Sequence, residues 1–381
     1  MKLLHTSDWH LGMVLRGGMS YAKDQEYAIQ GLIRIAKEEQ ADGILLAGDV
    51  FDKSIASPEA IRLYDRVMTE ICVTQGIPVY MIAGNHDGAE RLAQCGELMK
   101  AGGLYVAGAL SRQPYVVHAE DADLYLLPWI STDKVRSVFP ERADEVSSME
   151  DAYRIVLDAC RETFEAGRKH ILVAHAFIVN AQTSVSDRAA EVGQAAMVGS
   201  GLFDGFDYVA LGHLHGPQQI RENIRYSGSL MAYSFGREEQ QEKSVTIVDT
   251  DTLEQKIVPI PRLRRRTTLT GTCQELMAAE YPEDIRNGYV RLEVTDSYVG
   301  LDTIAAFRER YPNLLEVSGK TIDREDGRIT ITIEELEQIE QDPESVFFQY
   351  CRDIMEEAPG EHLLELFREA CQEVEKEESE A

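Results

Sequence analysis

The segment GILLAGDVFD, residues 43–52, decides the fold class. It begins as a continuous apolar run, which is typical of a parallel strand buried on both faces, and it ends in the carboxylates Asp49 and Asp52. Apolar runs at residues 2–6 and 77–85 flank it, and the residues between the runs repeat apolar positions at helical spacing. This order of strand, helix, strand, helix and strand predicts a layered α/β domain.

The same pattern continues toward the middle of the chain. Three more strands and one helix are expected, the strands at residues 124–129, 170–175 and 208–213 and the helix near residues 150–166. A pair of polar strands is expected next, formed by residues 225–230 and 244–249. The segment IPRLRRRTT, residues 260–268, holds four arginines and a proline. We place a domain boundary there, although an arginine run of this kind is usually only a solvated linker.

Three regions are therefore expected along the chain. A large α/β domain covers residues 1–265, a small α/β domain covers residues 266–340, and a helical segment covers residues 341–381. The 381 residues include 38 basic and 66 acidic side chains, which gives a formal net charge of −28. Half of that charge lies in the last 51 residues, which hold 17 acids and three basic residues. Bulk charge therefore argues against binding to nucleic acid or anionic membranes, but a local cationic site is not excluded.

The cysteines and the hydropathy pattern indicate a compartment. The six cysteines are scattered and form no C-x-x-C motif, which favours reduced thiols over disulfides or a thiolate metal site. No apolar run approaches the roughly 18 residues that a membrane span requires. The first residues, MKLLHTSD, reach Asp8 too early for a signal peptide. We therefore expect a cytoplasmic protein without membrane contact.

Candidate metal ligands follow one expected strand after another. These residues are Asp8, His10, Asp49, Asn85, His175, His213 and His215. Because ligands bind at the carboxyl ends of strands in open α/β sheets, these side chains are expected to converge on one edge of the sheet. Each motif alone is more often structural, for example a hydrogen-bonded histidine or a Gly-Asp turn. Five such motifs in this order are hard to reach by chance.

The donor types indicate which metals can bind. Carboxylate and amide oxygens occur with imidazole nitrogens and without thiolates, which suits Mn²⁺, Fe²⁺ or Mg²⁺, with Zn²⁺ as an alternative. Seven ligands are too many for one ion, and a bridging carboxylate would hold two ions about 3.5–4 Å apart. Two such ions with two carboxylates and neutral histidines leave a net charge of +2, which attracts phosphate. His86 has no ligand role in this scheme and can donate a proton or a hydrogen bond.

On these motifs the sequence resembles the calcineurin-like metallophosphoesterases. The words TSDWHLG, GDVFD, GNHD, LGHLHGPQ and YSGSLMAYSFGRE narrow the resemblance to the double-strand-break-repair nucleases, over roughly residues 1–260. The resemblance implies one metal held by Asp8, His10, Asp49 and His215, and a second held by Asp49, Asn85, His175 and His213. His86 matches the catalytic histidine. Asp52 matches a position that is histidine in some relatives, so it either donates a proton or orients a ligand histidine.

The resemblance also implies an activity and partners. It implies a DNA nuclease subunit with 3′–5′ double-strand exonuclease and single-strand or hairpin endonuclease activity. It also implies two divalent ions, Mn²⁺ foremost, and a homodimer within a heterotetramer that contains an SbcC-type coiled-coil ATPase. No nucleotide site is expected in this chain, because Gly319-Lys320-Thr321 lacks the P-loop glycine at position 314 and is read as a turn. The motifs leave open a stand-alone phosphoesterase acting on small nucleotides or phosphoproteins, and a non-catalytic scaffold is disfavoured because every ligand position is filled.

Two further segments have two interpretations each. The helices expected near residues 57–75 and 88–100 carry apolar side chains that either face the sheet or pair across a two-fold axis, including Tyr64, Met68, Leu92 and Met99. The tail is expected to form two short helices around a break at residues 358–360, with apolar faces that include Phe347 and Phe367. These helices either cap their own protein or dock on the coiled coil of the ATPase.

Overall fold

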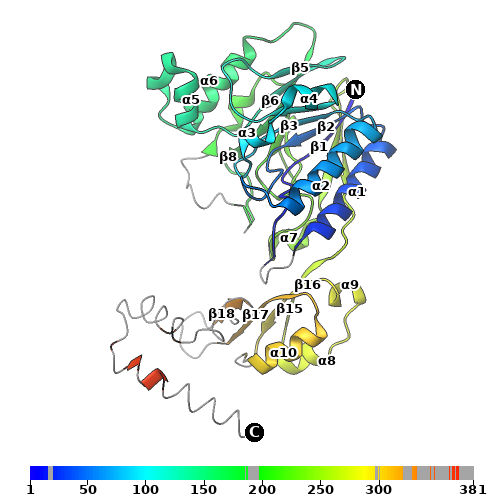
Figure 1. Ribbon diagram of the computed structural model, residues 1–381, viewed down its shortest axis with the longest axis vertical. Helices are drawn as coiled ribbons and strands as arrows, with labels where there is room; N and C mark the ends of the chain where they lie inside the picture. Colours follow the sequence, from blue (N-terminus) through cyan, green and yellow to red (C-terminus); the bar gives the residue numbers. More distant parts are fainter. Residues whose placement is uncertain are drawn as a thin grey trace. The chain divides into compact units, whose positions relative to one another are not determined.

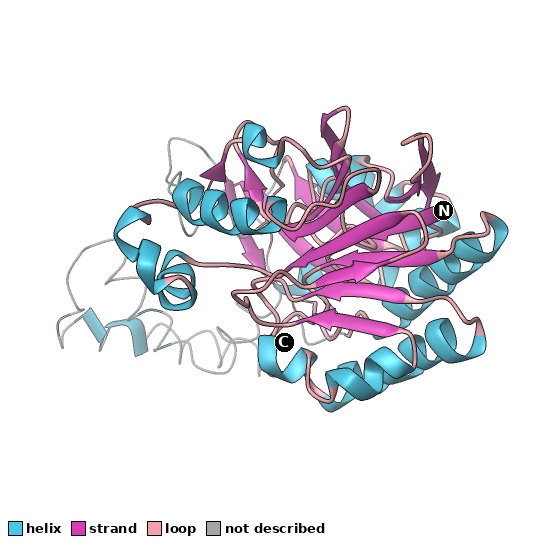
Figure 2. Ribbon diagram, turned by 90° about the horizontal axis from the view of Figure 1, so that it is seen from above, coloured by secondary structure: helices cyan, strands magenta, loops and turns pink. Residues whose placement is uncertain are grey.

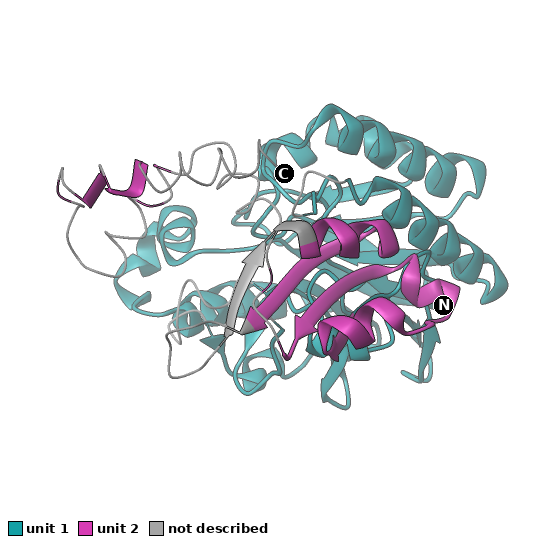
Figure 3. Ribbon diagram, turned by 90° about the horizontal axis from the view of Figure 1, so that it is seen from below, with its two compact units in different colours: residues 1–15, 19–267 teal, residues 16–18, 268–381 magenta. Residues whose placement is uncertain are grey.

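The computed structural model describes most of the chain, and it divides that chain into two compact units. The described residues are 1–15, 20–184, 186–187, 197–296, 299, 301–320, 328–332, 344, 347, 360, 363–364 and 366–368. One unit comprises residues 1–15 and 19–267, and the other comprises residues 16–18 and 268–381 (Figure 3). Within the described residues, no helix is long and apolar enough to cross a membrane.

The first unit contains two six-stranded sheets (Figure 2). The first sheet has the order β14-β13-β1-β2-β3-β4 and comprises β1 (Lys2–Thr6), β2 (Gly43–Ala47), β3 (Val79–Ile82), β4 (Leu104–Ala107), β13 (Ser244–Asp249) and β14 (Gln255–Pro259). Strands β1 to β4 pair in parallel, and β13 adds antiparallel to β1. The apolar runs of the sequence therefore form the parallel centre of this sheet, as predicted.

The second sheet takes up the strands predicted in the middle of the chain. Its order is β11-β12-β10-β7-β6-β5, with β5 (Val116–His118), β6 (Ala122–Leu127), β7 (Lys169–His175), β10 (Tyr208–Gly212), β11 (Gln218–Arg221) and β12 (Ile224–Tyr226). The predicted pairing of residues 225–230 with 244–249 is wrong. Strand β12 pairs with β10 and β11, whereas β13 belongs to the first sheet, and Arg225 reaches Thr246 only through its side chain at 3.0 Å.

The two sheets pack face to face, and helices cover their outer faces. Buried side chains from both sheets, among them Leu45, Ile82, Leu124 and Val173, form one apolar cluster between them. Helices α1 (Ala22–Glu38) and α2 (Pro58–Met68) cover the first sheet, and α6 (Met149–Arg161) covers the second (Figure 1). The helix expected from about residue 57 begins as α2, where Ser57 accepts a hydrogen bond from the amide of Ala60 at 3.2 Å and caps the helix.

Short elements connect these layers. They are the π-helical turn Thr69–Thr74, α3 (Ala89–Leu92), α4 (Gly96–Ala101), α5 (Thr132–Val138), the 3-10 turns Pro140–Glu145 and Ser200–Phe203, α7 (Arg237–Gln240), and the parallel pair β8 (Phe177–Ile178) and β9 (Met197–Val198). The single helix predicted near residues 88–100 is wrong. Cys95 has a φ of 60° and separates two short helices there.

The apolar side chains of these helices mostly face the core. Met68 and Leu92 are buried, and Tyr64 and Met99 pack against the same core cluster. Exposed apolar side chains lie elsewhere on the same segments, at Ile61, Val73 and Leu98, and just before α2 at Ile55. The residues named from the sequence therefore face the sheet, and any apolar contact with a partner would use these exposed residues instead.

The interpretation of residues 260–268 as a merely solvated arginine run is wrong for two of the arginines. Arg266 is buried, with its guanidinium 4.6 Å from the ring centroid of Phe235 and 5.7 Å from that of Tyr21. Arg264 pairs with the buried carboxylate of Asp24. Apolar rings and a buried acid therefore hold Arg264 and Arg266 within the first unit, where the sequence shows only a cluster of charges.

The second unit is a four-stranded sheet with helices. It comprises β15 (Arg266–Gly271), β16 (Tyr289–Val294), β17 (Leu314–Lys320), β18 (Arg328–Thr332), α8 (Cys273–Ala278), α9 (Glu283–Arg286) and α10 (Leu301–Arg310). Gly319 and Lys320 lie in β17 and pair with β18, so the turn predicted there is wrong. In the tail, the rings of Phe347 and Phe367 stack with centroids 4.1 Å apart. Tyr350, Cys351, Ile354, Ala370 and Val374, which the predicted helices include, lie outside the described residues.

Candidate metal centre

The candidate ligands lie at the carboxyl ends of five strands. Asp8 and His10 follow β1, Asp49 follows β2, Asn85 follows β3, His175 ends β7, and His213 and His215 follow β10. The structure brings all seven together, and all except Asn85 are buried. The expectation that they share one edge of a single sheet is wrong, because β1, β2 and β3 belong to the first sheet and β7 and β10 to the second. The site is therefore assembled where two sheets meet.

Among the residues that the structure describes, three groups of side chains offer donor atoms that lie within 4.8 Å of one another. They are Asp8 with His10 and His215, His10 with Asp49 and His86, and Asp49 with His175 and His213. Asn85 adds its side-chain oxygen, 3.0 Å from Nε2 of His175 and 3.1 Å from Nδ1 of His213. Asp49 belongs to two of the three groups, the one with His10 and the one with His175 and His213, so its carboxylate is placed to contribute to both of these.

The hydrogen bonds of His175 identify which of its nitrogens faces the site. Nδ1 lies 2.8 Å from the carbonyl oxygen of Ala47, which can only accept, so Nδ1 carries the hydrogen. Nε2 then directs its lone pair at two oxygens, Oδ2 of Asp49 at 3.3 Å and Oδ1 of Asn85 at 3.0 Å. A lone pair among acceptor oxygens requires a cation or a proton between them. This donor set fits a divalent metal ion.

The pKa shifts in the metal-free chain also indicate that the site favours a positive charge beside Asp49 and Asn85. Burial lowers the pKa of His175, but the charge of Asp49 and the hydrogen bond to it raise that pKa to about 9. Burial favours neutral Asp49, but the charge of His175 holds the pKa of this carboxylate well below its usual range. Burial, followed by the charge of His175, lowers the pKa of His213 to about 3. In the metal-free chain these charges therefore favour a proton on His175, so the site favours positive charge beside Asp49.

The other side of the centre is built around two facing imidazoles. Nε2 of His10 and Nε2 of His215 are 3.1 Å apart, and Oδ2 of Asp49 is 3.8 Å from Nε2 of His10. Nδ1 of His10 is buried and has no hydrogen bond among the described residues, and Oδ1 of Asp52 is 3.9 Å from it. Burial raises the pKa of Asp8 to about 6 in the absence of metal. Ring nitrogens and carboxylates at these spacings suit a second divalent ion.

His86 and Asp52 lie beside the centre. Nδ1 of His86 donates to the main-chain carbonyl oxygen of Asp52 at 2.7 Å, so Nε2 is directed toward Asp49, 4.0 Å from its Oδ2. The amide of His86 also donates to Oδ1 of Asp49 at 2.9 Å. Asp52 thus holds the His86 ring through its backbone, while its carboxylate lies near His10.

Asp87 orders the loops that carry the ligands. Its carboxylate accepts hydrogen bonds from the amides of Gly84 at 2.8 Å, Val50 at 3.1 Å and Phe51 at 2.9 Å. Asp87 does not cap the helix that follows it, because α3 begins after Gly88 without a side-chain cap. Asp87 therefore connects the loop after β2 with the loop after β3.

The backbone of the site is strained and crowded. Asp8, His10, Asp49 and His213 all have positive φ, at 52°, 45°, 50° and 104°, a region that non-glycine residues rarely adopt. At Gly212, an added Cβ would lie 1.8 Å from the carbonyl oxygen of Ala47 on the facing sheet. The glycine before His213 is thus required because the two sheets approach closely at the metal centre.

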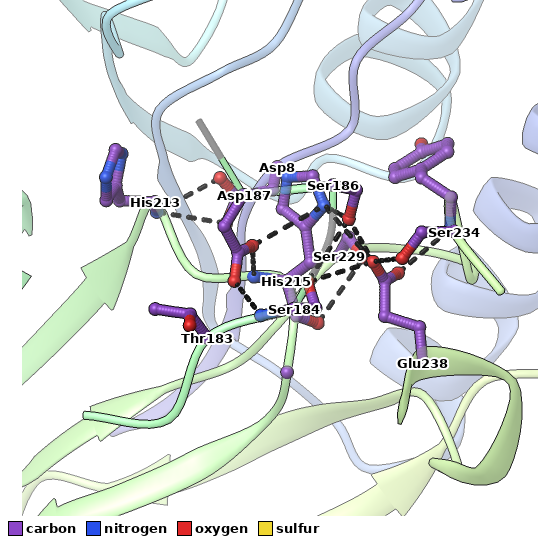
Figure 4. A network of polar contacts seen from close by, with 12 residues as sticks. Asp8, Thr183, Ser184, Ser186, Asp187, His213, His215, Ser229, Ser234 and Glu238 are labelled. Atoms are coloured by element: carbon purple, nitrogen blue, oxygen red, sulfur yellow. Dashed lines mark hydrogen bonds and ion pairs between the residues drawn. The ribbon is translucent and has the colours of Figure 1, made fainter. Parts of the chain in front are cut away.

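A polar network behind His215 was not predicted (Figure 4). Asp187 accepts the amide of His215 at 2.9 Å, and Ser186 contacts the ring at Nδ1 at 2.7 Å. Glu238 is fully buried and pairs with Lys243 at 3.0 Å. Of these residues, only Glu238 lies in a sequence word typical of the family, and no spacing pattern points to the others.

Comparisons with known proteins extend these observations. The model of the calcineurin-like phosphoesterase family matches residues 1–217. The D subunit of the SbcCD nuclease of Staphylococcus saprophyticus is 30% identical over 366 residues, which cover 95% of this chain and 94% of that protein. The protein of the same name from Staphylococcus epidermidis is 30% identical over 331 residues, covering 86% and 87%. The chain belongs to the SbcD family of calcineurin-like phosphoesterases.

Membership of this family confirms the resemblance and the fold class expected from the sequence. Among solved structures, the protein TT1561 of Thermus thermophilus matches 68% of this chain and 99% of its own length, at 12% identity and a TM-score of 0.38. The SbcD relatives align with nearly the whole chain, so the similarity includes the second unit. The family implies divalent metal ions, and the clustered histidines and aspartates described above fit them.

Proposed function

We propose that this chain is the nuclease subunit of an SbcC–SbcD-type complex and hydrolyses phosphodiester bonds of DNA with two divalent ions. The observation that carries the proposal is the carboxylate of Asp49, which groups with His10 on one side and with His175 and His213 on the other, while His10 also groups with Asp8 and His215. One ion would be held by Asp8, His10, Asp49 and His215, and the other by Asp49, Asn85, His175 and His213. Mn²⁺ is the proposed metal, because mixed oxygen and imidazole donors suit it, with Mg²⁺ or Fe²⁺ as alternatives.

The chain's own residues orient the reacting groups. Two divalent ions, when bound, supply positive charge for a phosphodiester and activate water for attack on phosphorus. His86 has its Nδ1 hydrogen committed to the carbonyl of Asp52, so its Nε2 is the atom left to face the substrate. In the doubly protonated imidazolium form, Nε2 would donate a proton or hydrogen bond to the leaving oxygen. Asp52 acts by positioning, since its carbonyl orients His86 and its carboxylate lies 3.9 Å from Nδ1 of His10.

Local charge accounts for substrate binding by an acidic protein. Two divalent ions and the carboxylates of Asp8 and Asp49 leave the centre at +2 if the histidines are neutral, although the whole chain carries −28. DNA would therefore be attracted at the metal centre rather than by a broad basic surface. Cleavage would proceed as a 3′–5′ double-strand exonuclease and as an endonuclease on single strands and hairpins.

The remaining parts of the chain have proposed roles in assembly. Residues 266–340 are proposed to contact DNA as a capping domain, and residues 341–381 to dock on the coiled coil of an SbcC-type ATPase in the cytoplasm. Exposed Ile61 on α2 and Leu98 on α4 are candidates for a homodimer contact within the heterotetramer. Light scattering at micromolar concentration tests that contact, and a monomer would contradict it.

The stand-alone phosphoesterase alternative is less favoured, because the SbcD relatives extend through the second unit. The experiment is a Mn²⁺-dependent cleavage assay on linear duplex DNA, with and without the SbcC partner, beside a nitrophenyl phosphodiester. Cleavage of both substrates, with the partner increasing only DNA cleavage, is the expected result. Hydrolysis of the small ester without any DNA cleavage in either condition would overturn the nuclease proposal.

A further inference from the structure

The ring of His215 is held from behind by a serine and a carboxylate. Oγ of Ser186 lies 2.7 Å from Nδ1 of His215 and also hydrogen-bonds Oε1 of Glu238 (Figure 4). Oε1 of Glu238 is itself 3.7 Å from Nδ1, too far for a direct hydrogen bond. The serine hydroxyl therefore lies between the carboxylate and the imidazole.

The direction of these hydrogen bonds follows from the chemistry of the groups. The carboxylate of Glu238 is ionised beside the ammonium of Lys243, so it can only accept. The single hydroxyl hydrogen of Ser186 must then go to Glu238, and its oxygen accepts from His215. Nδ1 of His215 thus carries the hydrogen, and Nε2 keeps a lone pair directed at the metal centre, 3.1 Å from Nε2 of His10.

Glu238 forms the fixed end of the hydrogen bonds that run from His215 through Ser186. Its side chain is fully buried and accepts hydrogen bonds from the hydroxyls of Ser184 at 3.0 Å and Ser234 at 2.7 Å, and from the amide of Tyr233 at 2.9 Å. Its ion pair with Lys243 is buried as well. A carboxylate with this many donors has one orientation, so the acceptor that it offers Ser186 is fixed.

The same ion pair also holds the main chain of His215. Nζ of Lys243 donates to the carbonyl oxygen of His215 at 2.8 Å and to Oγ of Ser229 at 3.0 Å. Asp187 accepts the amide of His215 at 2.9 Å. Both the backbone and the ring of His215 are therefore anchored by groups that lie outside the candidate ligand set.

We propose that Ser186 and Glu238 are positioning residues that fix the Nδ1–H tautomer of His215 and so present its Nε2 as a metal donor. Histidine ligands commonly donate their second nitrogen to a carboxylate, and here a serine hydroxyl relays that interaction. The inference rests on the proposed two-metal site and adds the means by which one of its ligands is prepared before metal binds.

The test uses Ser186→Ala, because this change leaves the buried pair of Glu238 and Lys243 intact. In metal-free protein with ¹⁵N-labelled histidine, the ring signals of His215 are expected to report Nδ1–H in the wild type. They are expected to report a mixture of tautomers in Ser186→Ala. The matched control is Ser234→Ala, which removes another hydroxyl from Oε1 of Glu238 without a contact to His215 and should keep the wild-type tautomer.

Metal affinity supplies a second readout. A Mn²⁺ titration followed by electron paramagnetic resonance should show one of two sites weakened about 10- to 100-fold in Ser186→Ala. Ser186→Thr keeps the hydroxyl and should restore both the tautomer and the affinity. An Nε2–H tautomer in the wild type, or an unchanged tautomer and affinity in Ser186→Ala, would overturn the inference. Because the tautomer is read without metal or DNA, a wild type that keeps Nδ1–H but fails to cut DNA would overturn only the proposed nuclease.

Discussion

His175 donates from Nδ1 to the carbonyl oxygen of Ala47 at 2.8 Å, and this hydrogen bond connects the two sheets of the first unit. Ala47 ends β2 in the first sheet, and His175 ends β7 in the second. The orientation of a candidate ligand is therefore set by the packing of one sheet on the other. Changes at the sheet interface should reach the metal centre even where they touch no ligand.

Gly212→Ala tests this dependence. The added Cβ would lie 1.8 Å from the carbonyl oxygen of Ala47, so the sheets must separate or His175 must lose its acceptor. We expect a loss of about 1–3 kcal/mol in the free energy of unfolding, as for other overpacked cores, together with weaker metal binding. Urea unfolding and a Mn²⁺ titration measure the two effects. Gly96→Ala, where nothing lies within 4 Å of the new Cβ, is the matched control. Unchanged metal affinity in Gly212→Ala would show that the sheet contact does not orient His175.

Metal stoichiometry separates the shared ligand from an unshared one. Asp49→Ala removes the carboxylate that two of the three donor groups share, so we expect the bound metal to fall from two ions per chain to one or none. His213→Ala should lose only one ion, because its ring contributes to a single group. Elemental analysis of metal-loaded protein gives the count, with the exposed His118→Ala as a control. A wild type that holds a single ion would contradict the two-metal centre.

His86→Gln addresses catalysis without loss of metal. The ring contacts Asp52 and Asp49 but is not assigned as a ligand, so both ions should remain bound. Cleavage of DNA should fall about 10²- to 10⁴-fold, the range for removal of a general acid or base. Initial rates of duplex digestion, measured beside metal content, check both expectations. Near-normal rates with full metal content would remove His86 from the mechanism.

His5 should make the metal-free protein sensitive to acid. Burial lowers the pKa of His5 to about 3; a hydrogen bond with the carbonyl of Leu211 opposes this shift, and the charge of Arg225 adds to it. Nδ1 of His5 lies 2.9 Å from the hydroxyl of Tyr208. The folded state keeps this ring neutral while the unfolded state binds a proton below about pH 6.5, so stability is lost as the pH falls from 6.5 toward 3.

Between pH 6.5 and pH 5 this loss amounts to about 2 kcal/mol. In His5→Gln, the difference in unfolding free energy between pH 7 and pH 5 should shrink by about that amount. Urea unfolding of metal-free protein at both pH values gives the difference. His118→Gln also removes one histidine, but an exposed one, and serves as the control. An unchanged pH dependence in His5→Gln would show that another group controls acid stability.

Truncation after residue 340 tests the proposed role of the tail. If residues 341–381 dock on the coiled coil, the shortened chain should lose binding to the SbcC partner and keep Mn²⁺-dependent cleavage of a nitrophenyl phosphodiester. Co-purification and the ester assay measure the two properties on the same preparation. Full-strength co-purification of the truncated chain would contradict the docking assignment.

The sequence predicted the candidate ligands because each one follows an apolar run, and such a run ends at the same edge as its parallel neighbours. It could not predict that two sheets share them. Strand β13 pairs with β1 although their residues are more than 240 positions apart, and no local sequence pattern predicts which strands pair over that distance. Arg266 looked solvated for a related reason, since Phe235 and Tyr21 surround it only after folding.

The residues behind His215 escaped prediction for a chemical reason. A serine that relays a hydrogen bond, such as Ser186, has no distinctive residue type or spacing in the sequence. Glu238 lies in the charged segment GREEQ, which the sequence suggests is exposed, yet its side chain is fully buried. Its burial depends on Lys243 and on several hydroxyls that converge in space, so the sequence showed only another acid in an acidic protein.

The left-handed backbone at Asp8, His10, Asp49 and His213 has a consequence for directed evolution. Each such position costs on the order of 1–3 kcal/mol for a residue with a side chain, and glycine would relieve that cost while removing a candidate ligand. A library selected for heat resistance alone should therefore enrich glycine at these four positions and yield robust proteins without metal. Engineers who seek a thermostable enzyme from this scaffold need to select for metal retention in every round.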